Sequence, residues 1–189
     1  MSRSQDRLAR SGLYRLLARL WLREADVHLL HQLGSGALGE AFLNAGGVLP
    51  ALVTGETVED LAVDYCQLFL GPSQHFPPYQ SVWQAGQFEG EASKSVREFA
   101  EVVRYDATAA APGGMVDHLG VQFDLMGHLL AADGDTTEAV IDEMAAVFFA
   151  AHLMWPGTLL DAAQTRAQSE FYGSMLALTQ SFLDLESQA

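Results

Sequence analysis

The chain has little cysteine, little isoleucine and no long apolar run, and each shortage excludes a class of protein. Cys66 is the only cysteine among 189 residues, so no intramolecular disulfide can form, which fits a reducing compartment. Ile141 is the only isoleucine, and β-branched runs are few, which argues against a sheet. No apolar run reaches the roughly 18 residues that a membrane span needs. We therefore expect a cytoplasmic protein without stable membrane insertion.

Basic residues are also scarce, and most of them lie at the N-terminus. Ten Lys and Arg face 24 Asp and Glu, giving a net charge of −14. Six arginines lie in residues 1–24 against only Asp6 and Glu24, so this segment carries +4. The four basic and 22 acidic residues that follow give the rest of the chain −18. An acidic body repels nucleic acid and attracts cationic partners, so no nucleic-acid partner is expected.

The apolar periodicity is helical almost throughout and predicts an all-α fold, a single bundle of about eight to nine helices in one domain over residues 1–189. Thr57, with Asp60 three residues later, predicts a capping-box-like start for the fourth helix. Residues 106–115 form a predicted linker, either a loop within one bundle or a hinge for helix exchange between protomers. We therefore expect a monomer or a dimer, with domain swapping as one route to the dimer. The expected helices lie near 4–23, 26–33, 36–44, 57–70, 91–105, 116–132, 136–153, 157–165 and 168–186.

Two patterns suggest a cofactor or a metal, and neither has the right context. Residues 34–39 match G-x-G-x-x-G, but the preceding segment is predicted to be helix, whereas a dinucleotide fingerprint follows a strand. Asp117, Asp124 and His128 share one face of a predicted helix, which is more typical of a solvated face than of a metal site. No HExxH, no Glu-x-x-His pair and no phosphate loop occurs. We expect no cofactor and no metal.

Residues 65–83 combine a helix stop with an aromatic loop. Gly71 is expected to close the helix in the left-handed conformation, and Pro72 cannot continue it. Prolines 77 and 78 then hold the loop extended. Phe76, Tyr79 and Trp83 follow, either as part of a binding wall or as a loop that buries its own aromatics.

The pair Asp117-His118 opens a predicted helix directly after the linker. Asp117 is suited to cap that helix or to complement its dipole. No serine, cysteine or lysine nucleophile is adjacent in sequence, so the pair does not point to catalysis. We expect a protein that is not an enzyme.

Three segments together resemble one family. They are Tyr65-Cys-Gln-Leu-Phe-Leu-Gly-Pro72 with Pro77-Pro-Tyr-Gln-Ser-Val-Trp83, then Asp117-His-Leu-Gly120 with Gln122-Phe-Asp-Leu-Met126, and finally His152-Leu-Met-Trp155 with Glu170-Phe-Tyr172. Their order and spacing are similar to those of the TorD/DmsD family, cytoplasmic chaperones that mature molybdenum-cofactor redox enzymes.

The resemblance implies an all-helical chaperone that binds the twin-arginine signal peptide of an apo-molybdoenzyme precursor, assists cofactor insertion and holds the precursor before export. Peptide binding would then fall on Tyr65, Leu68, Phe69, Asp117 and His118 by matching motif positions, with Pro72, Tyr79 and Trp83 as further candidates for an apolar wall. Asp117 would meet a ligand arginine, and His118 would tune that contact with pH. An alternative is an assembly factor that docks on the mature catalytic subunit without binding the signal peptide.

Overall fold

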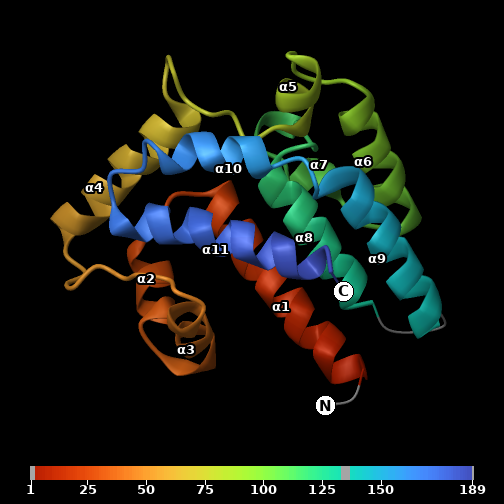
Figure 1. The fold of residues 1–189 in the computed structure, drawn as a ribbon, viewed down its shortest axis with the longest axis horizontal. Helices are drawn as coiled ribbons and strands as arrows, with labels where there is room; N and C mark the ends of the chain where they lie inside the picture. Colours follow the sequence, from red (N-terminus) through yellow and green to blue (C-terminus); the bar gives the residue numbers. More distant parts are fainter. Residues whose placement is uncertain (1–2, 133–136, 189) are drawn as a thin grey trace. The chain divides into compact units, whose positions relative to one another are not determined.

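The computed structural model describes residues 3–132 and 137–188, and within them every regular element is helical (Figure 1). The described residues form eleven α-helices rather than the predicted eight to nine, because two short helices lie in segments that we expected to be loop. None of the described helices alone has both the length and the apolar character of a membrane span. The helices are α1 (Arg3–Leu22), α2 (Val27–Leu33), α3 (Gly36–Asn44), α4 (Gly55–Tyr65), α5 (Gln80–Ala85), α6 (Glu91–Val102), α7 (Ala107–Ala110), α8 (Leu119–Leu130), α9 (Glu138–His152), α10 (Gly157–Gln164) and α11 (Glu170–Glu186), with a π-helix at Cys66–Leu70 and a 3-10 turn at Pro112–Gly114.

The start of α4 differs from the predicted capping box. Thr54 precedes the helix with an extended backbone, and its side-chain oxygen accepts the backbone N–H of Thr57 at 3.1 Å. Thr57 therefore lies inside the first turn, and the predicted cap was placed three residues too late. Two threonines three residues apart can each cap a helix, and the local sequence did not decide between them.

The end of α4 also differs from the prediction. The chain widens into the π-helix at Cys66–Leu70, and Gly71 follows with φ −58° and ψ 162°, which is not the left-handed conformation. Pro72 explains this backbone, because proline pushes the residue before it into an extended conformation. Cys66 is exposed on this turn.

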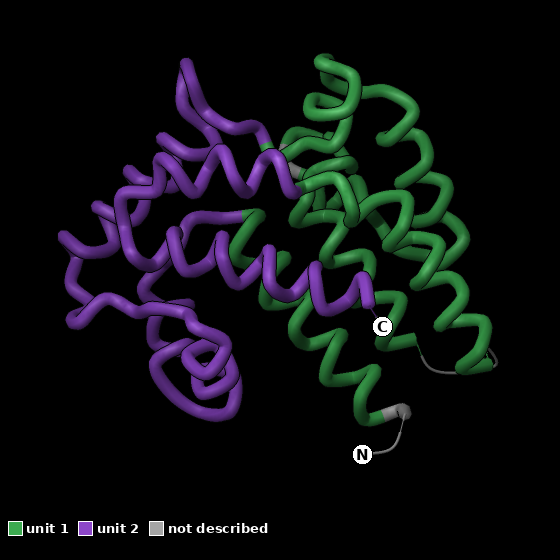
Figure 2. Tube along the Cα trace, viewed as in Figure 1, with its two compact units in different colours: residues 1–22, 78–156 green, residues 23–77, 157–189 purple. Residues whose placement is uncertain are grey.

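The chain divides into two compact units that each combine distant segments of sequence (Figure 2). Unit 1 contains residues 1–22 and 78–156, and unit 2 contains residues 23–77 and 157–189. Residues 106–115, the predicted hinge, lie within unit 1, where they contribute α7 and the 3-10 turn. A single domain and a helix exchange through this segment stay predictions.

Unit 1 is built around α8, which packs along α1 and also contacts α7 and α9. Two glycines of α8 permit this close packing. A Cβ atom at Gly120 would lie 2.6 Å from Leu22 Cγ, and one at Gly127 would lie 2.9 Å from Arg15 Cγ. Apolar side chains at helical spacing form the buried sides of α1 and α8. In α1, Leu16, Leu17 and Leu20 are buried while Leu13 is partly exposed, and in α8 the buried set contains Leu119, Phe123, Met126 and Leu130.

Unit 2 contains α2, α3, α4, the π-helix, α10 and α11. Aromatic rings form its core: Tyr65 contacts Tyr172 with ring centroids 5.8 Å apart, and Phe42 contacts Phe171 at 6.1 Å. The Tyr172 hydroxyl accepts the Ala25 backbone N–H at 3.0 Å. Through Tyr65 and Tyr172, the end of α4 therefore packs against α11, the last helix of the chain.

Candidate functional site

The eight residues predicted to bind peptide are split evenly between the two units. Tyr65, Leu68, Phe69 and Pro72 belong to unit 2, whereas Tyr79, Trp83, Asp117 and His118 belong to unit 1. Each group is therefore described within its own unit.

The unit 2 group is mostly core. Tyr65, Leu68 and Phe69 are each at most 3% exposed, and the rings of Tyr65 and Phe69 meet edge to face at 5.2 Å. Pro72 is exposed. In this conformation Pro72 can touch a ligand directly, and the three buried side chains can support it by fixing the π-helix.

Asp64, a residue that sequence analysis did not select, anchors this segment. Its buried carboxylate accepts the Ser169 backbone N–H at 2.8 Å, the Ser169 hydroxyl at 2.6 Å and the Gln168 N–H at 3.1 Å. Asp64 thus joins the end of α4 to the N-terminus of α11. Nothing local in the sequence points to this role, because its partners lie about a hundred residues away.

The loop after Gly71-Pro72 has a defined shape. The Phe76 backbone N–H donates to the Leu68 carbonyl at 2.7 Å, and Gln74 takes a positive φ of 59°. Arg166 donates from Nη1 to the Gln74 carbonyl at 2.8 Å, and its guanidinium lies 5.7 Å from the centre of the Phe76 ring. One arginine therefore makes a cation–π contact and a hydrogen bond to the same loop.

In unit 1, Asp117 ties the segment 78–81 to the start of α8. It is 1% exposed; one carboxylate oxygen accepts the Ser81 backbone N–H at 2.9 Å and the other accepts the Ser93 hydroxyl at 2.8 Å. The backbone adds two bonds, from the Gln80 N–H to the Asp117 carbonyl at 3.1 Å and from the Leu119 N–H to the Pro78 carbonyl at 2.8 Å. Asp117 thus holds the polypeptide that leads into Tyr79 and Trp83.

His118, not Asp117, caps α8, so the expected capping role moves by one residue. Its Nδ1 accepts the Gly120 backbone N–H at 3.0 Å, which leaves any proton of the neutral ring on Nε2. The Tyr79 ring packs edge to face on the imidazole at 5.0 Å. Tyr79 and Trp83 are both half-buried, so they present part of their surface to solvent.

A buried network of polar side chains connects those parts of the three family-like segments that belong to unit 1. Gln80 Oε1 accepts Gln122 Nε2 at 2.7 Å and lies 2.9 Å from His152 Nδ1, while Gln80 Nε2 donates to the Ala151 carbonyl at 2.9 Å. Trp155 Nε1 donates to Gln122 Oε1 at 2.9 Å. Gln80, Gln122 and Trp155, one from each segment, are therefore joined through hydrogen bonds within unit 1.

Burial keeps the two histidines of this region neutral. Desolvation lowers the pKa of His118 to about 4, and the nearby Asp117 carboxylate opposes that shift. The pKa of His152 is also lowered to about 4 for the same reasons. Burial raises the pKa of Tyr79, with a further contribution from Asp117. Near neutral pH, Asp117 is therefore surrounded by uncharged rings and hydroxyls.

The predicted solvated face of α8 is partly covered. Asp124 accepts the Tyr105 hydroxyl at 2.6 Å, and His128 Nε2 lies 3.1 Å from the Val103 carbonyl. Both residues are half-buried rather than solvated, because the segment after α6 packs over them. In the part of the chain that the structure describes, no three His, Cys, Asp or Glu residues are grouped to hold a metal.

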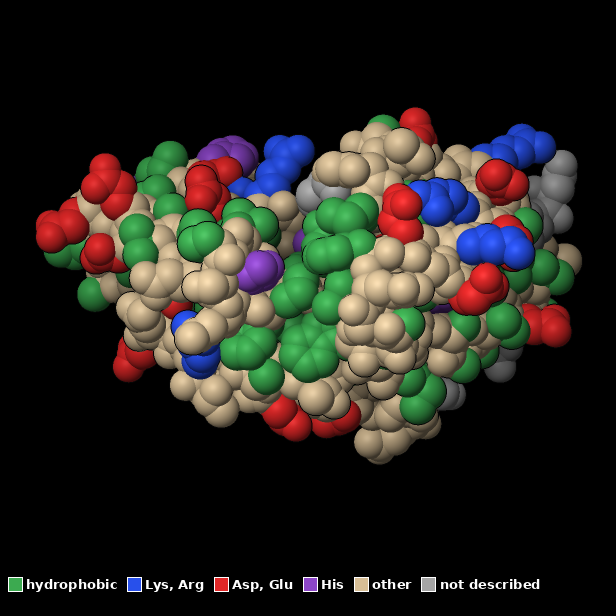
Figure 3. All heavy atoms as spheres, turned by 90° about the horizontal axis from the view of Figure 1, so that it is seen from above, with side chains coloured by type: hydrophobic (Ala, Val, Ile, Leu, Met, Phe, Trp, Pro, Cys, Tyr) green, Lys and Arg blue, Asp and Glu red, His purple; other side chains and the backbone are tan. Residues whose placement is uncertain are grey.

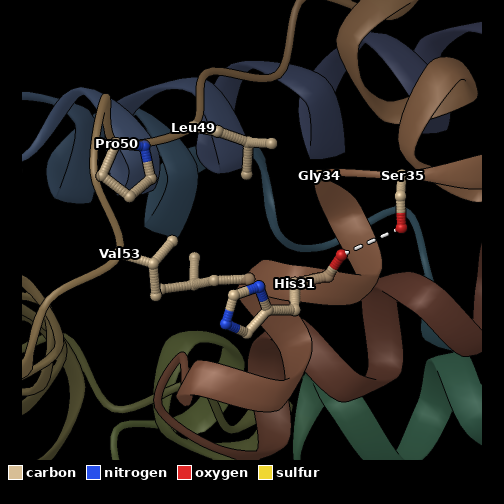
Figure 4. Close-up of a pocket in the computed structure, with 7 residues that line it drawn as sticks. His31, Gly34, Ser35, Leu49, Pro50 and Val53 are labelled. Carbon is tan, nitrogen blue, oxygen red and sulfur yellow. Dashed lines mark hydrogen bonds between the residues drawn. The ribbon is translucent and has the colours of Figure 1, made fainter.

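The G-x-G-x-x-G motif is the turn between α2 and α3, as expected. A Cβ atom at Gly39 would lie 2.3 Å from the Leu33 carbonyl oxygen, so glycine lets the two helices meet. A cavity of about 340 Å³ lies beside this turn, with His31 and Ser35 on one side and Leu49, Pro50 and Val53 on the other (Figure 4). The Ser35 hydroxyl donates to the His31 carbonyl at 3.2 Å. A helix rather than a strand leads into the motif, which is not the dinucleotide-binding arrangement.

Comparison with known proteins gives the class. The family model for the nitrate reductase delta subunit matches residues 36–177, so the chain belongs to that family. A chaperone protein TorD from Shewanella sp. (strain ANA-3) is 27% identical, with 95% of this chain and 93% of the relative covered. The chaperone protein YcdY of Escherichia coli (strain K12) is 28% identical over 89% of each chain. A chaperone protein TorD from Aeromonas salmonicida (strain A449) is 30% identical over 72% of this chain. No solved structure gave a significant match.

These relatives confirm the resemblance to the TorD/DmsD family and the expected class, a chaperone rather than an enzyme.

Proposed function

We propose that the chain is a system-specific cytoplasmic chaperone that binds the twin-arginine signal peptide of a molybdopterin-dependent oxidoreductase precursor, assists cofactor insertion and holds the precursor before export. The observation that carries the proposal is the hydrogen-bonded assembly of the three family-like segments around Asp117 and Gln80. Family membership and TorD relatives over most of the chain support the chaperone class.

The charge and exposed side chains suit such a ligand. A twin-arginine leader has a basic head followed by an apolar, helix-prone segment. The chain carries a net charge of −14, and acidic and hydrophobic side chains are both exposed on the face drawn in Figure 3. Each buried apolar side chain contributes about 1.5–3 kcal/mol, whereas an exposed ion pair contributes about 0.2–1 kcal/mol. Apolar contacts should therefore provide most of the affinity, and charge should provide association rate and selectivity.

The residues divide by role according to burial. Pro72, Tyr79 and Trp83 have exposed surface and are proposed to contact the peptide. Tyr65, Leu68 and Phe69 are proposed to support the Gly-Pro loop from the core. A direct ion pair between Asp117 and a leader arginine stays a prediction, since it would have to replace the Ser81 and Ser93 bonds. The geometry supports a positioning role for Asp117 and His118.

Titration with a labelled twin-arginine leader peptide tests the proposal. Trp83→Ala should weaken binding by about tenfold or more, which corresponds to about 1.4 kcal/mol. Val102→Ala is the matched control, because Val102 is 69% exposed on α6 in the same unit. No measurable binding by the wild-type chain would overturn the proposal, and equal losses in both variants would remove Trp83 from the site.

The second candidate is an assembly factor that docks on the mature catalytic subunit. The observation that favours it is the family model itself, which describes a subunit of a nitrate reductase. Pull-down of precursors with and without their leader separates the two functions. Equal capture of both forms would favour docking on the mature region, and loss of capture without the leader would favour signal-peptide binding.

A further inference from the structure

The exposed face of α9 is unusually apolar for a helix surface. The helix buries Ile141, Ala145, Phe148 and His152 on one side. Its other side exposes residues at helical spacing, which we call the α9 face: Ala139, Val140, Asp142, Glu143, Ala146, Val147, Ala150 and Ala151. Val140 is 43% exposed, Val147 is 54% exposed, and Met154 just beyond the helix is 66% exposed. An amphipathic surface helix normally carries charged and polar residues here.

The α9 face carries two charged residues, Asp142 and Glu143. The neighbours of Glu143 at i−3, i+3 and i+4 are Val140, Ala146 and Val147, so Glu143 lies within the apolar stripe. Among the described residues, neither Glu143 nor Asp142 pairs with a cation, whereas Glu138 has a long contact of 3.9 Å with Arg7. The sequence contains no Lys or Arg between Arg104 and Arg166, so residues close to Glu143 along the chain supply no cation.

This composition defines what can cover the α9 face. A covering surface would bury Glu143, and a buried carboxylate without a cation is strongly unfavourable. A second copy that presents its own α9 face would bring no Lys or Arg. The occupant must therefore carry apolar side chains together with a cationic one.

The C-terminal end of the α9 face is joined to the segment that contains Tyr79 and Trp83. Gln80 Nε2 donates to the carbonyl of Ala151, so α5 starts beside the last turn of α9. From Glu143 to Ala151 the helix rises by about 12 Å, which matches about eight residues of a helical ligand. Tyr79 and Trp83 belong to the segment around Gln80 that meets this last turn of α9.

We propose that the α9 face is a docking surface for an arginine-headed apolar helix, with the arginines at Glu143 and the apolar segment running toward α5. This inference rests on the proposed function and assigns a surface to the leader peptide. The acidic N-terminal part of α9, with Glu138, Asp142 and Glu143, orients the basic head. The alanines and valines contact the apolar segment, and small side chains let the two helices approach closely.

A charge swap tests the inference. A labelled synthetic peptide with an Arg-Arg head and an apolar helical segment is titrated against the wild type, Val147→Glu and Glu143→Lys. Val147→Glu should raise Kd by about tenfold or more, because it places a charge in the apolar contact. Glu143→Lys should weaken binding of the Arg-Arg peptide and restore binding of the same peptide with a Glu-Glu head. Both substitutions are on exposed positions, so the proteins should fold, and thermal unfolding checks this.

Matched controls lie on α6 of the same unit. Val102→Glu and Glu98→Lys make the same chemical changes at exposed helical positions and should leave Kd unchanged. Wild-type binding with no effect of the α9 variants would overturn the inference and leave the proposed function standing. Absence of wild-type binding would overturn both. A wild-type dimer that Val147→Glu dissociates without changing peptide affinity would identify the face as a self-association surface and overturn the inference.

Discussion

Two neighbouring helices of unit 1, α8 and α9, have similarly apolar sequences and very different surroundings. In α8, all residues except Asp124 and His128 are buried. In α9, only Ile141, Ala145, Phe148 and His152 are buried, and an Ala- and Val-rich face is exposed. Apolar composition alone therefore does not show which helix is the core of the unit and which one keeps a free surface.

The physical difference is what packs against each helix. Glycines 120 and 127 let α1 approach α8 closely, and the Ser11 hydroxyl donates to the Gly127 carbonyl at 2.7 Å. The exposed side of α9 is rich in small side chains and has a carboxylate without a partner among the described residues. A large apolar residue in α8 therefore contributes to the stability of the core, whereas one on the exposed side of α9 is a candidate for binding a partner.

The largest effect is expected from Phe123→Ala in α8. Phe123 is fully buried and its ring lies 6.0 Å from that of Tyr14. Removing it should lower the free energy of unfolding by about 3–5 kcal/mol, since a cavity remains in a close-packed core. Urea denaturation followed by circular dichroism measures this. A loss below about 1 kcal/mol would contradict the central position of α8.

Asp117→Ala should have the next largest effect, because it leaves the Ser81 N–H and the Ser93 hydroxyl without their acceptor. We expect a loss of about 1–3 kcal/mol in unfolding free energy. Ser93→Ala alone should cost less, and the double variant should cost less than the sum of the two single variants. Additive losses would show that the Asp117–Ser93 bond makes no net contribution.

Lower pH should destabilise the start of α8 and the end of α9 through their buried histidines. The pKa of His118 and of His152 is about 4 in the folded chain against 6.5 for an ordinary imidazole. The unfolded chain therefore takes up protons first, so stability is retained above pH 6.5 and lost as pH falls toward 4. Thermal unfolding across this range checks the sign, and His152→Gln should flatten the profile.

The smallest effect on stability is expected from Val147→Ala on the exposed side of α9. Surface substitutions of this kind usually change unfolding free energy by no more than about 0.5 kcal/mol. The same denaturation assay used for Phe123→Ala gives a direct comparison. A loss above about 1.5 kcal/mol would mean that the α9 face is covered in the folded chain.

Much of the fold could be predicted from the sequence because helical periodicity is a local signal. The nine expected helices all exist, and the stripe Leu119, Phe123, Met126 and Leu130 is buried. Two predictions were wrong because a nearby residue has the stronger effect. Pro72 keeps Gly71 out of the predicted left-handed conformation, and Thr54 rather than Thr57 caps α4. The short helices α5 and α7 were missed because six and four residues show no clear period.

The candidate site was less predictable. The motifs were found from the sequence, but their connections were not, since Asp64 bonds to Ser169, and Gln80 to Gln122 and His152. Such partners lie far apart in the chain. The apolar pattern of the sequence could not reveal these contacts either. A polar residue in a helix can be exposed to solvent or buried with a hydrogen-bond partner, and the pattern is the same in both cases.

An acidic chain built from helices, with no intramolecular disulfide, follows from the amino-acid sequence alone, because charge, cysteine number and apolar period are local properties that any folded arrangement must keep. Long-range packing was needed to make Asp117 a buried acceptor, His118 the helix cap and one side of α9 an exposed apolar face. Burial and hydrogen bonding of these groups depend on what long-range packing brings beside them.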